Sequence, residues 1–181
     1  MNALKSIKSI FLAMMVMGLS YGGPAEANKS GYINCLRTKP IQFDGTIVDA
    51  VLATPALSTL KDLVIKAGLV DALKGPGPLT VYAPLNAAFL AIPEDIRTGI
   101  VSDDTVLTSV LTYHVSPGLR DPRRPRIPSE VKTLQGQTVF FSSAKQPQIN
   151  QSIAACQGVR TSNGIVWLID SVLLPQFKVS P

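Results

Sequence analysis

The stretch that decides the fold is Asn163–Pro175, which has the sequence NGIVWLIDSVLLP. Asn163-Gly164 is a strong signal for a hairpin turn, because both residue types tolerate positive φ angles. The five apolar residues Ile165–Ile169 follow without a break and are too few to cross a membrane. A short apolar run rich in β-branched residues is typical of a strand buried on both faces. We therefore predict that much of the chain packs around this strand.

The rest of the chain carries two kinds of apolar pattern. Helical spacing with capping residues predicts helices within 46–53, 58–74, 86–102 and 103–111, and Ser58 and Asn86 are expected as N-caps. Short apolar runs between turn residues predict strands at 79–83, 112–116, 131–134, 138–141, 148–150 and 158–161. Helices in the first half and strands in the second indicate one α+β domain, which we place at 46–177 after an extended arm at 28–45.

The first residues are expected to direct export. Lys5 and Lys8 form a basic start, the apolar core is 10–19, and Ala25-Glu26-Ala27 has the small-x-small pattern of a cleavage site. We predict a secretory signal peptide at 1–27 that is cleaved near Ala27, with an uncleaved anchor helix as the alternative. The mature protein is then expected to be secreted, periplasmic or at the cell surface.

Export changes what the two cysteines, Cys35 and Cys156, are expected to do. Two cysteines in an oxidising compartment can pair in only one way, so we predict a disulfide between them. The alternative is a pair of free buried thiols. The bond would tie the mature N-terminus to the region just before the strand at Ile165–Ile169.

The segment 119–130 differs from its surroundings because arginines alternate with prolines. Proline blocks both a helix and a central strand, so we predict an exposed, semi-rigid loop. Its arginines could bind carboxylate, sulfate or phosphate groups of an acidic partner, or could simply be solvated. Nucleic acid is not expected, because the loop has no aromatic residues for stacking and the chain is exported. These candidate binding residues are Arg120, Arg123, Arg124 and Arg126.

Three ordered segments resemble the fasciclin domain family. Thr80–Phe89, TVYAPLNAAF, is similar to its first motif, and Asn163–Pro175 is similar to its second. Leu111–Val115, LTYHV, lies between them like the family's Tyr-His segment. One departure is Leu85, which stands where the family usually has a small hydroxyl residue. The residues that match the motifs, and are expected to be structural, are Thr80, Pro84, Asn86, Phe89, Asn163, Gly164, Asp170 and Pro175.

The resemblance implies a wedge-like β-sandwich of short strands with helices packed along it. It also implies an adhesion or binding module with no enzymatic activity. In animal members the Tyr-His segment is associated with integrin-mediated adhesion, which would fall on Tyr113 and His114. The short chain with a simple signal peptide looks bacterial, so we do not expect integrin as its partner.

His114 is the only histidine in the chain. It could act as a base or a metal ligand, but no cysteine or carboxylate cluster stands at ligand spacing and no nucleophile elbow is present. We therefore expect a packed, hydrogen-bonded strand histidine, no metal and no cofactor. Asp170 is expected to accept backbone hydrogen bonds, and Trp167 and Tyr82 are expected in the core.

Two functions remain open from the sequence. The first is an interaction module that binds a surface protein or an acidic polysaccharide, with peripheral membrane contact at most. The second is a carrier of an apolar small molecule, such as a carotenoid or lipid, in a cleft of the domain. The sequence does not indicate the oligomeric state.

Overall fold

The computed structural model describes residues 29–124, 129–143 and 146–177. The predicted signal peptide and Arg126 lie outside these residues. The helices are α2 (Lys29–Arg37), α3 (Ile47–Ala53), a 3-10 turn η1 (Pro55–Leu57), α4 (Ser58–Lys66), α5 (Val70–Lys74), α6 (Asn86–Leu90), α7 (Glu94–Ser102) and α8 (Asp104–Tyr113). The strands are β1 (Ile41–Gln42), β2 (Leu79–Pro84), β3 (Val115–Pro117), β4 (Glu130–Lys132), β5 (Thr138–Ser142), β6 (Gln148–Ile149), β7 (Ser152–Ile153), β8 (Val159–Thr161) and β9 (Gly164–Ile169).

The strands form two sheets. One has five strands in the order β1-β8-β9-β2-β3, and the other has four in the order β4-β5-β6-β7. In the larger sheet, β9 pairs in parallel with β2 and antiparallel with β8. The smaller sheet is antiparallel throughout. Among the described residues, no helix is both long enough and apolar enough to cross a bilayer.

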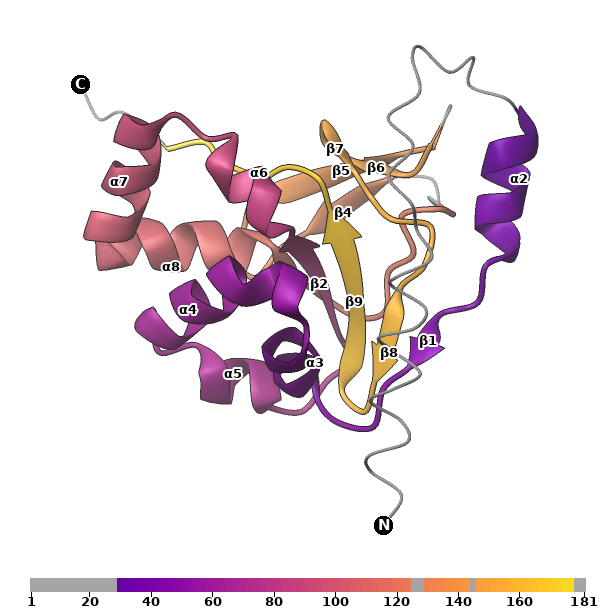
Figure 1. Ribbon diagram of the computed structural model, residues 1–181, viewed down its shortest axis with the longest axis horizontal. Helices are drawn as coiled ribbons and strands as arrows, with labels where there is room; N and C mark the ends of the chain where they lie inside the picture. Colours follow the sequence, from indigo (N-terminus) through magenta and orange to yellow (C-terminus); the bar gives the residue numbers. More distant parts are fainter. Residues whose placement is uncertain (1–28, 125–128, 144–145, 178–181) are drawn as a thin grey trace.

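Helices α3 to α8 gather on one side of the larger sheet, while α2 lies apart on the opposite side, beyond β1 (Figure 1). One apolar cluster joins these helices to the sheet, and a second joins the larger sheet to the smaller one. The expected α+β class is therefore confirmed.

Strand β9 is buried on both faces, as its apolar run predicts. Val166 belongs to the cluster under the helices, whereas Ile165, Trp167 and Ile169 belong to the cluster between the sheets. This alternation follows from the two-residue period of a strand. The strand therefore forms part of both cores.

The expected hairpin joins β8 to β9, but its two-residue turn is Ser162-Asn163, because Gly164 already pairs with Thr161 as the first residue of β9. Neither Asn163 nor Gly164 has a positive φ angle. Gly164 is required because an added Cβ would lie 2.0 Å from the Leu79 carbonyl oxygen on β2. Asn163 instead joins two helices: its Oδ1 accepts from the Ile47 N–H at the start of α3, and its Nδ2 donates to the Leu73 carbonyl at the end of α5.

Two predicted segments are wrong. The arm is not simply extended, because 29–37 forms helix α2. The disulfide and the Tyr32 hydrogen bond hold this helix against the rest of the fold, and the local sequence does not indicate either contact. The predicted strand at 112–116 begins only at Val115, because Thr112 and Tyr113 complete α8 and His114 is its C-cap.

The two predicted side-chain caps are also wrong. Ser58 opens α4 and Asn86 opens α6, and neither side chain caps its own helix. The Asn86 Oδ1 accepts from the Thr59 N–H, so Asn86 caps the start of α4 from another segment. A side chain from a neighbouring element satisfies an orphan helix donor as well as a local one does.

Candidate functional site

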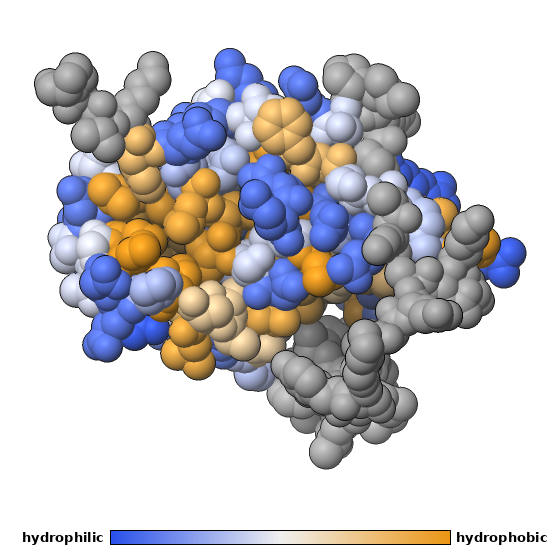
Figure 2. All heavy atoms as spheres, turned by 90° about the horizontal axis from the view of Figure 1, so that it is seen from above, coloured by the Kyte–Doolittle hydropathy of each residue, from blue (hydrophilic) through white to orange (hydrophobic). Residues whose placement is uncertain are grey.

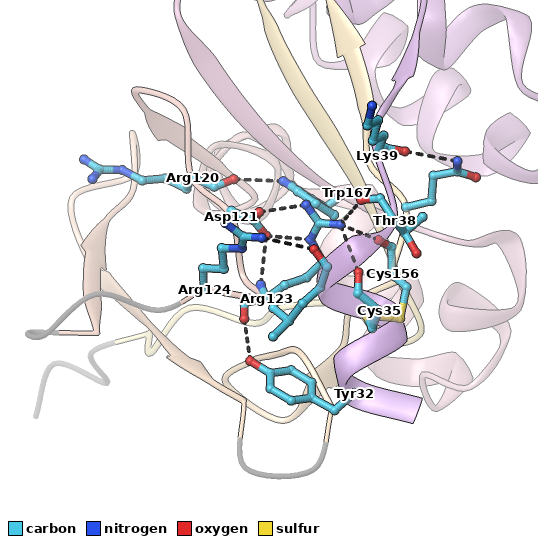
Figure 3. Close-up of polar contacts among 12 residues, drawn as sticks. Tyr32, Cys35, Thr38, Lys39, Arg120, Asp121, Arg123, Arg124, Cys156 and Trp167 are labelled. Atoms are coloured by element: carbon cyan, nitrogen blue, oxygen red, sulfur yellow. Dashed lines mark hydrogen bonds and ion pairs between the residues drawn. A yellow bond between two sulfur atoms is a disulfide. The ribbon is translucent and has the colours of Figure 1, made fainter. Parts of the chain in front are cut away.

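Arg123 is buried, which contradicts its expected place in an exposed binding loop; it is 5% exposed. Its Nε and Nη2 donate to the two carboxylate oxygens of Asp121 at 2.9 and 2.8 Å. Its Nη1 donates to the carbonyl oxygens of Cys35, Thr38 and Cys156 (Figure 3). A guanidinium with this many internal acceptors is structural and cannot bind an external acidic partner as well.

Arg120 and Arg124 are exposed, so they remain candidates for binding. The main chain of Arg120 is fixed, because its N–H donates to the Thr80 hydroxyl and its carbonyl accepts from the Trp167 indole N–H at 2.8 Å. Arg124 donates to the Leu36 carbonyl of α2. Of the three arginines of the loop that the structure describes, Arg123 is buried and stabilises the fold, whereas Arg120 and Arg124 are exposed.

The predicted disulfide between Cys35 and Cys156 is present. It joins α2 to the segment before β8, next to the Arg123 guanidinium (Figure 3). The Tyr32 hydroxyl of α2 donates to the Arg123 carbonyl as well. Helix α2 is thus held by a covalent bond and by hydrogen bonds to the arginine loop.

His114 is 3% exposed and both of its ring nitrogens are occupied. Nδ1 donates to the Val110 carbonyl at 2.8 Å, and Nε2 accepts from the Leu173 N–H at 2.9 Å. Burial lowers its pKa to about 4, because the charged ring would lose its hydration. The packed, hydrogen-bonded histidine is therefore confirmed, at a helix end and not in a strand. Within the described residues, no group of three potential metal ligands gathers anywhere.

Apolar pockets lie on two sides of His114. One, of about 40 Å³, is lined by residues such as Val51, Leu60 and Val64, and the other, of about 60 Å³, by residues such as Phe89 and Ile100. Pockets for drug-sized ligands typically enclose about 300–1,000 Å³. A carotenoid or lipid would therefore need the helices to separate.

Hydrophobic side chains also reach the surface on the helical side of the molecule (Figure 2). Leu90 of α6 is 75% exposed. Single exposed apolar residues are common on protein surfaces, so this position alone indicates no binding site.

Tyr113 contacts an open groove, unlike its neighbour His114. The groove has a volume of about 790 Å³ and is formed by the end of α8, strand β5, the β6–β7 turn and the segment after β9. We call it the Tyr113 groove. Its described lining residues are Tyr113, Gln137, Thr138, Phe140, Asn150, Gln151, Leu174 and Gln176.

Strand β5 explains why the groove has an aromatic wall. Phe140 and Phe141 are consecutive in a strand, so their side chains must point to opposite faces. Phe141 joins the core between the sheets, and Phe140 is left 52% exposed in the groove. This sequence signal was available and was missed, since only one of two adjacent strand aromatics can enter the same core.

The polar walls of the groove are held in place by internal hydrogen bonds. Asn150 adopts a positive φ of 52° in the two-residue β6–β7 turn. Its Oδ1 accepts from the Phe140 N–H, and its Nδ2 donates to the Tyr113 hydroxyl. The Tyr113 hydroxyl in turn donates to the Thr138 carbonyl. The Gln137 amide accepts from the Gln176 N–H and donates to the Gln176 carbonyl.

Among the lining residues that the structure describes, the Tyr113 phenol is the one ionisable group. Leu174 adds an apolar side chain that is 45% exposed. An exposed ring, an exposed aliphatic group and several amides are suited to binding, and the described lining residues include no carboxylate, histidine, lysine or cysteine.

The remaining motif residues are structural. The Thr80 hydroxyl donates to the Gly118 carbonyl, and Phe89 lies in the helical core. Pro84 ends β2 and is buried, as is Pro175. The Asp170 carboxylate accepts from the Ile153 N–H at 2.8 Å, as expected for a carboxylate that follows an apolar strand.

Comparisons with known proteins give a consistent result. A model of the fasciclin domain matches residues 55–175. Cell surface glycolipoprotein MPB83 of Mycobacterium bovis is 37% identical over 135 residues, which are 71% of this chain but 60% of that relative. Immunogenic protein MPB70 of the same species is 34% identical over 148 residues, covering 76% of this chain and 75% of the relative. Protein sll1483 of Synechocystis is 35% identical over 133 residues, covering 72% and 73%.

The fold has a solved counterpart as well. A FAS1 domain pair from the insect cell adhesion molecule Fasciclin I aligns with a TM-score of 0.60 at 15% identity. The alignment covers 72% of this chain and 51% of that chain. At this identity the likeness concerns the fold alone.

Proposed function

Because the chain belongs to the fasciclin domain family, we propose that it is an exported interaction module of the cell surface and that it binds its partner in the Tyr113 groove. One relative is named a cell surface glycolipoprotein, and the solved counterpart comes from a cell adhesion molecule. These names support a surface role, while the choice of binding face rests on the geometry of this chain.

The observation that carries the proposal is the exposure of Phe140 in a preorganised groove. Phe140 is 52% exposed, although the chain buries Tyr82 and Trp167 completely. Aromatic side chains dominate the energy of many binding surfaces. The groove volume of about 790 Å³ falls within the range of known ligand clefts, about 300–1,000 Å³.

The disulfide supports export. Disulfides persist in oxidising compartments and are rare in the cytosol, so the bond between Cys35 and Cys156 agrees with the predicted signal peptide at 1–27. We place the mature protein outside the cytoplasm, in the periplasm, on the cell surface or in the medium.

The direct test is binding to cell envelopes isolated from the native organism. The mature chain and the variant Phe140→Ala are labelled and titrated against these envelopes. We expect Phe140→Ala to weaken binding at least tenfold, because truncating a hot-spot aromatic residue of a binding surface costs about 2 kcal/mol or more, roughly 30-fold. The matched control is Leu90→Ala, an exposed apolar residue outside the groove, which should bind like the wild type. Equal binding by Phe140→Ala and wild type would contradict the proposal.

The two other candidates have weaker support. An acidic polysaccharide could contact two exposed arginines, Arg120 and Arg124, in the described part of the loop. Arg123 is not available to it, because its guanidinium pairs with Asp121. An apolar carrier would rely on the small pockets beside His114. The envelope titration separates these cases, because neither depends on Phe140.

A further inference from the structure

We propose that the Tyr113 groove binds a neutral saccharide, an inference that rests on the proposed function and names the chemical class of its ligand. A sugar ring presents an apolar C–H face and a rim of hydroxyl groups. The groove offers a complementary pair of features: an exposed aromatic ring and uncharged amides fixed around it.

The first support is the lack of net charge at the groove. None of the lining residues that the structure describes carries a charged side chain. On strand β4, Glu130 pairs with Phe140 and Lys132 pairs with Thr138, so one anion and one cation lie at the edge of the groove. This balanced pair gives an acidic saccharide no net attraction, whereas a neutral saccharide needs none.

The second support is the apolar surface that the groove exposes. Phe140 and Leu174 are 52% and 45% exposed. The face of an aromatic ring carries partial negative charge, so it attracts the weakly positive C–H groups of a sugar ring stacked on it. Leu174 extends the apolar surface with which such a ring can make contact.

The third support is the hydrogen-bonding capacity that remains around the ring. The side chains of Gln151 and Gln176 have no hydrogen-bond partner in the part of the chain that the structure describes. Asn150 and Gln137 are each held by an internal donor and acceptor, and each amide nitrogen retains a second N–H. Amides that both donate and accept can pair with sugar hydroxyls, which do the same.

The internal bonds also reduce the entropic cost of binding. A side chain that is already held in one rotamer loses less freedom when a ligand arrives, and long polar side chains otherwise lose about 0.5–1.5 kcal/mol each. Asn150 and Gln137 are held in this way, through Tyr113 and the Gln176 main chain. The groove is thus prepared for a polar ligand and needs no rearrangement of these two residues.

The test uses native envelopes treated in two ways before binding of the mature chain. Mild periodate cleaves vicinal diols of sugars, and exhaustive protease digestion removes protein partners. We expect periodate to abolish binding, protease to leave it within twofold, and a change from 50 to 500 mM NaCl to alter it by less than about threefold, since exposed ion pairs weaken with salt. Phe140→Ala should lose binding at least tenfold, with Leu90→Ala as control.

Each other outcome has a defined meaning. Binding that depends on Phe140 but is lost after protease and survives periodate overturns the saccharide inference and leaves the groove as a protein-binding face. Binding that falls steeply with salt overturns it in favour of an acidic partner. Binding that Phe140→Ala does not change, or no binding by the wild type, overturns the proposed function itself. Circular dichroism of Phe140→Ala excludes misfolding as the cause of a loss.

Discussion

The guanidinium of Arg123 lies over the indole ring of Trp167, 4.8 Å from the ring centroid. Trp167 is the fully buried centre of β9, and Arg123 comes from the loop that the sequence suggested was exposed. The pair therefore joins the arginine loop to the strand around which the chain is organised. The same guanidinium bonds the carbonyls of both cysteines, so strand, loop and α2 meet at this residue.

Replacing Arg123 should destabilise the fold strongly. Arg123→Met removes the cation–π contact and all the hydrogen bonds that the guanidinium donates to Asp121 and to three carbonyl groups. Breaking one side of a buried ion pair costs about 3–5 kcal/mol, and we expect the lower end because Asp121 is partly exposed. Urea unfolding measures the change. Arg124→Gln, one residue along and exposed, is the control and should change stability by about 0.5 kcal/mol or less. Equal effects from the two variants would contradict the assignment.

Gly164 and Gly99 should respond oppositely to alanine. At Gly164 an added Cβ would lie 2.0 Å from the Leu79 carbonyl oxygen, so Gly164→Ala must push β9 away from β2. We expect a loss of about 3 kcal/mol or more, or failure to fold. Gly99 lies exposed in α7 with nothing within 4 Å, and Gly99→Ala should stabilise by about 0.5–1 kcal/mol. Thermal denaturation of both variants tests this, and a tolerated Gly164→Ala would show that the two strands are not so close.

The pKa of His114 predicts how stability depends on pH. The pKa is about 4 in the fold, against an ordinary value of 6.5, so the unfolded chain binds the extra proton between these values. The free energy of unfolding is therefore highest, with respect to His114, above pH 6.5, and it decreases as the pH drops toward 4. The loss between pH 7 and pH 5 should be about 2 kcal/mol.

His114→Gln is the control for this prediction, because it can donate and accept without titrating. It should be less stable than wild type at pH 7 but show almost no loss down to pH 5. The pKa of Asp49 is lowered, chiefly by its backbone hydrogen bond to Thr46. Protonation of Asp49 therefore reduces stability only at a more acidic pH than this range. An unchanged pH profile in His114→Gln would show that another group is responsible.

Removing the disulfide should release α2 and lower stability. The bond links residues separated by 121 positions, and closing so long a loop contributes up to about 4–5 kcal/mol in the chain-entropy model. The double variant Cys35→Ser/Cys156→Ser should lose part or all of this stabilisation, which urea unfolding measures. Hydrogen exchange should speed up in α2 while the β2–β9 core keeps its protection. Free Cys35 and Cys156 thiols in the exported protein would show that the bond does not form in the cell.

Much of the fold could be predicted from local signals. The apolar run Ile165–Ile169 predicts a doubly buried strand, because it is short, rich in β-branched and aromatic residues and preceded by a glycine. Asp103 was recognisable as a helix start, and it accepts from the N–H groups of Thr105 and Val106. The two cysteines allow only one pairing, so the disulfide needed no geometric information.

The errors arose where a distant partner decides the structure. Arg123 is buried because Asp121, Trp167 and the carbonyl groups of both cysteines surround it. No local sequence pattern predicts this burial. Asn86 caps α4 and not its own helix for a similar reason. The candidate site was predictable only in part: Tyr113 was singled out, but the groove also needs Phe140, Asn150 and Leu174, which the chain brings together from separate segments.

The most direct measurement is the mapping of ligand-induced amide shifts by NMR. The ¹⁵N-labelled mature protein is titrated with the neutral saccharide fraction released from native envelopes. We predict saturable shifts at Thr138, Phe140, Asn150 and Gln151, and their loss in Phe140→Ala. Shifts that concentrate instead around Arg120 and Arg124, or in the helices beside His114, would contradict the claim that the Tyr113 groove is the binding face.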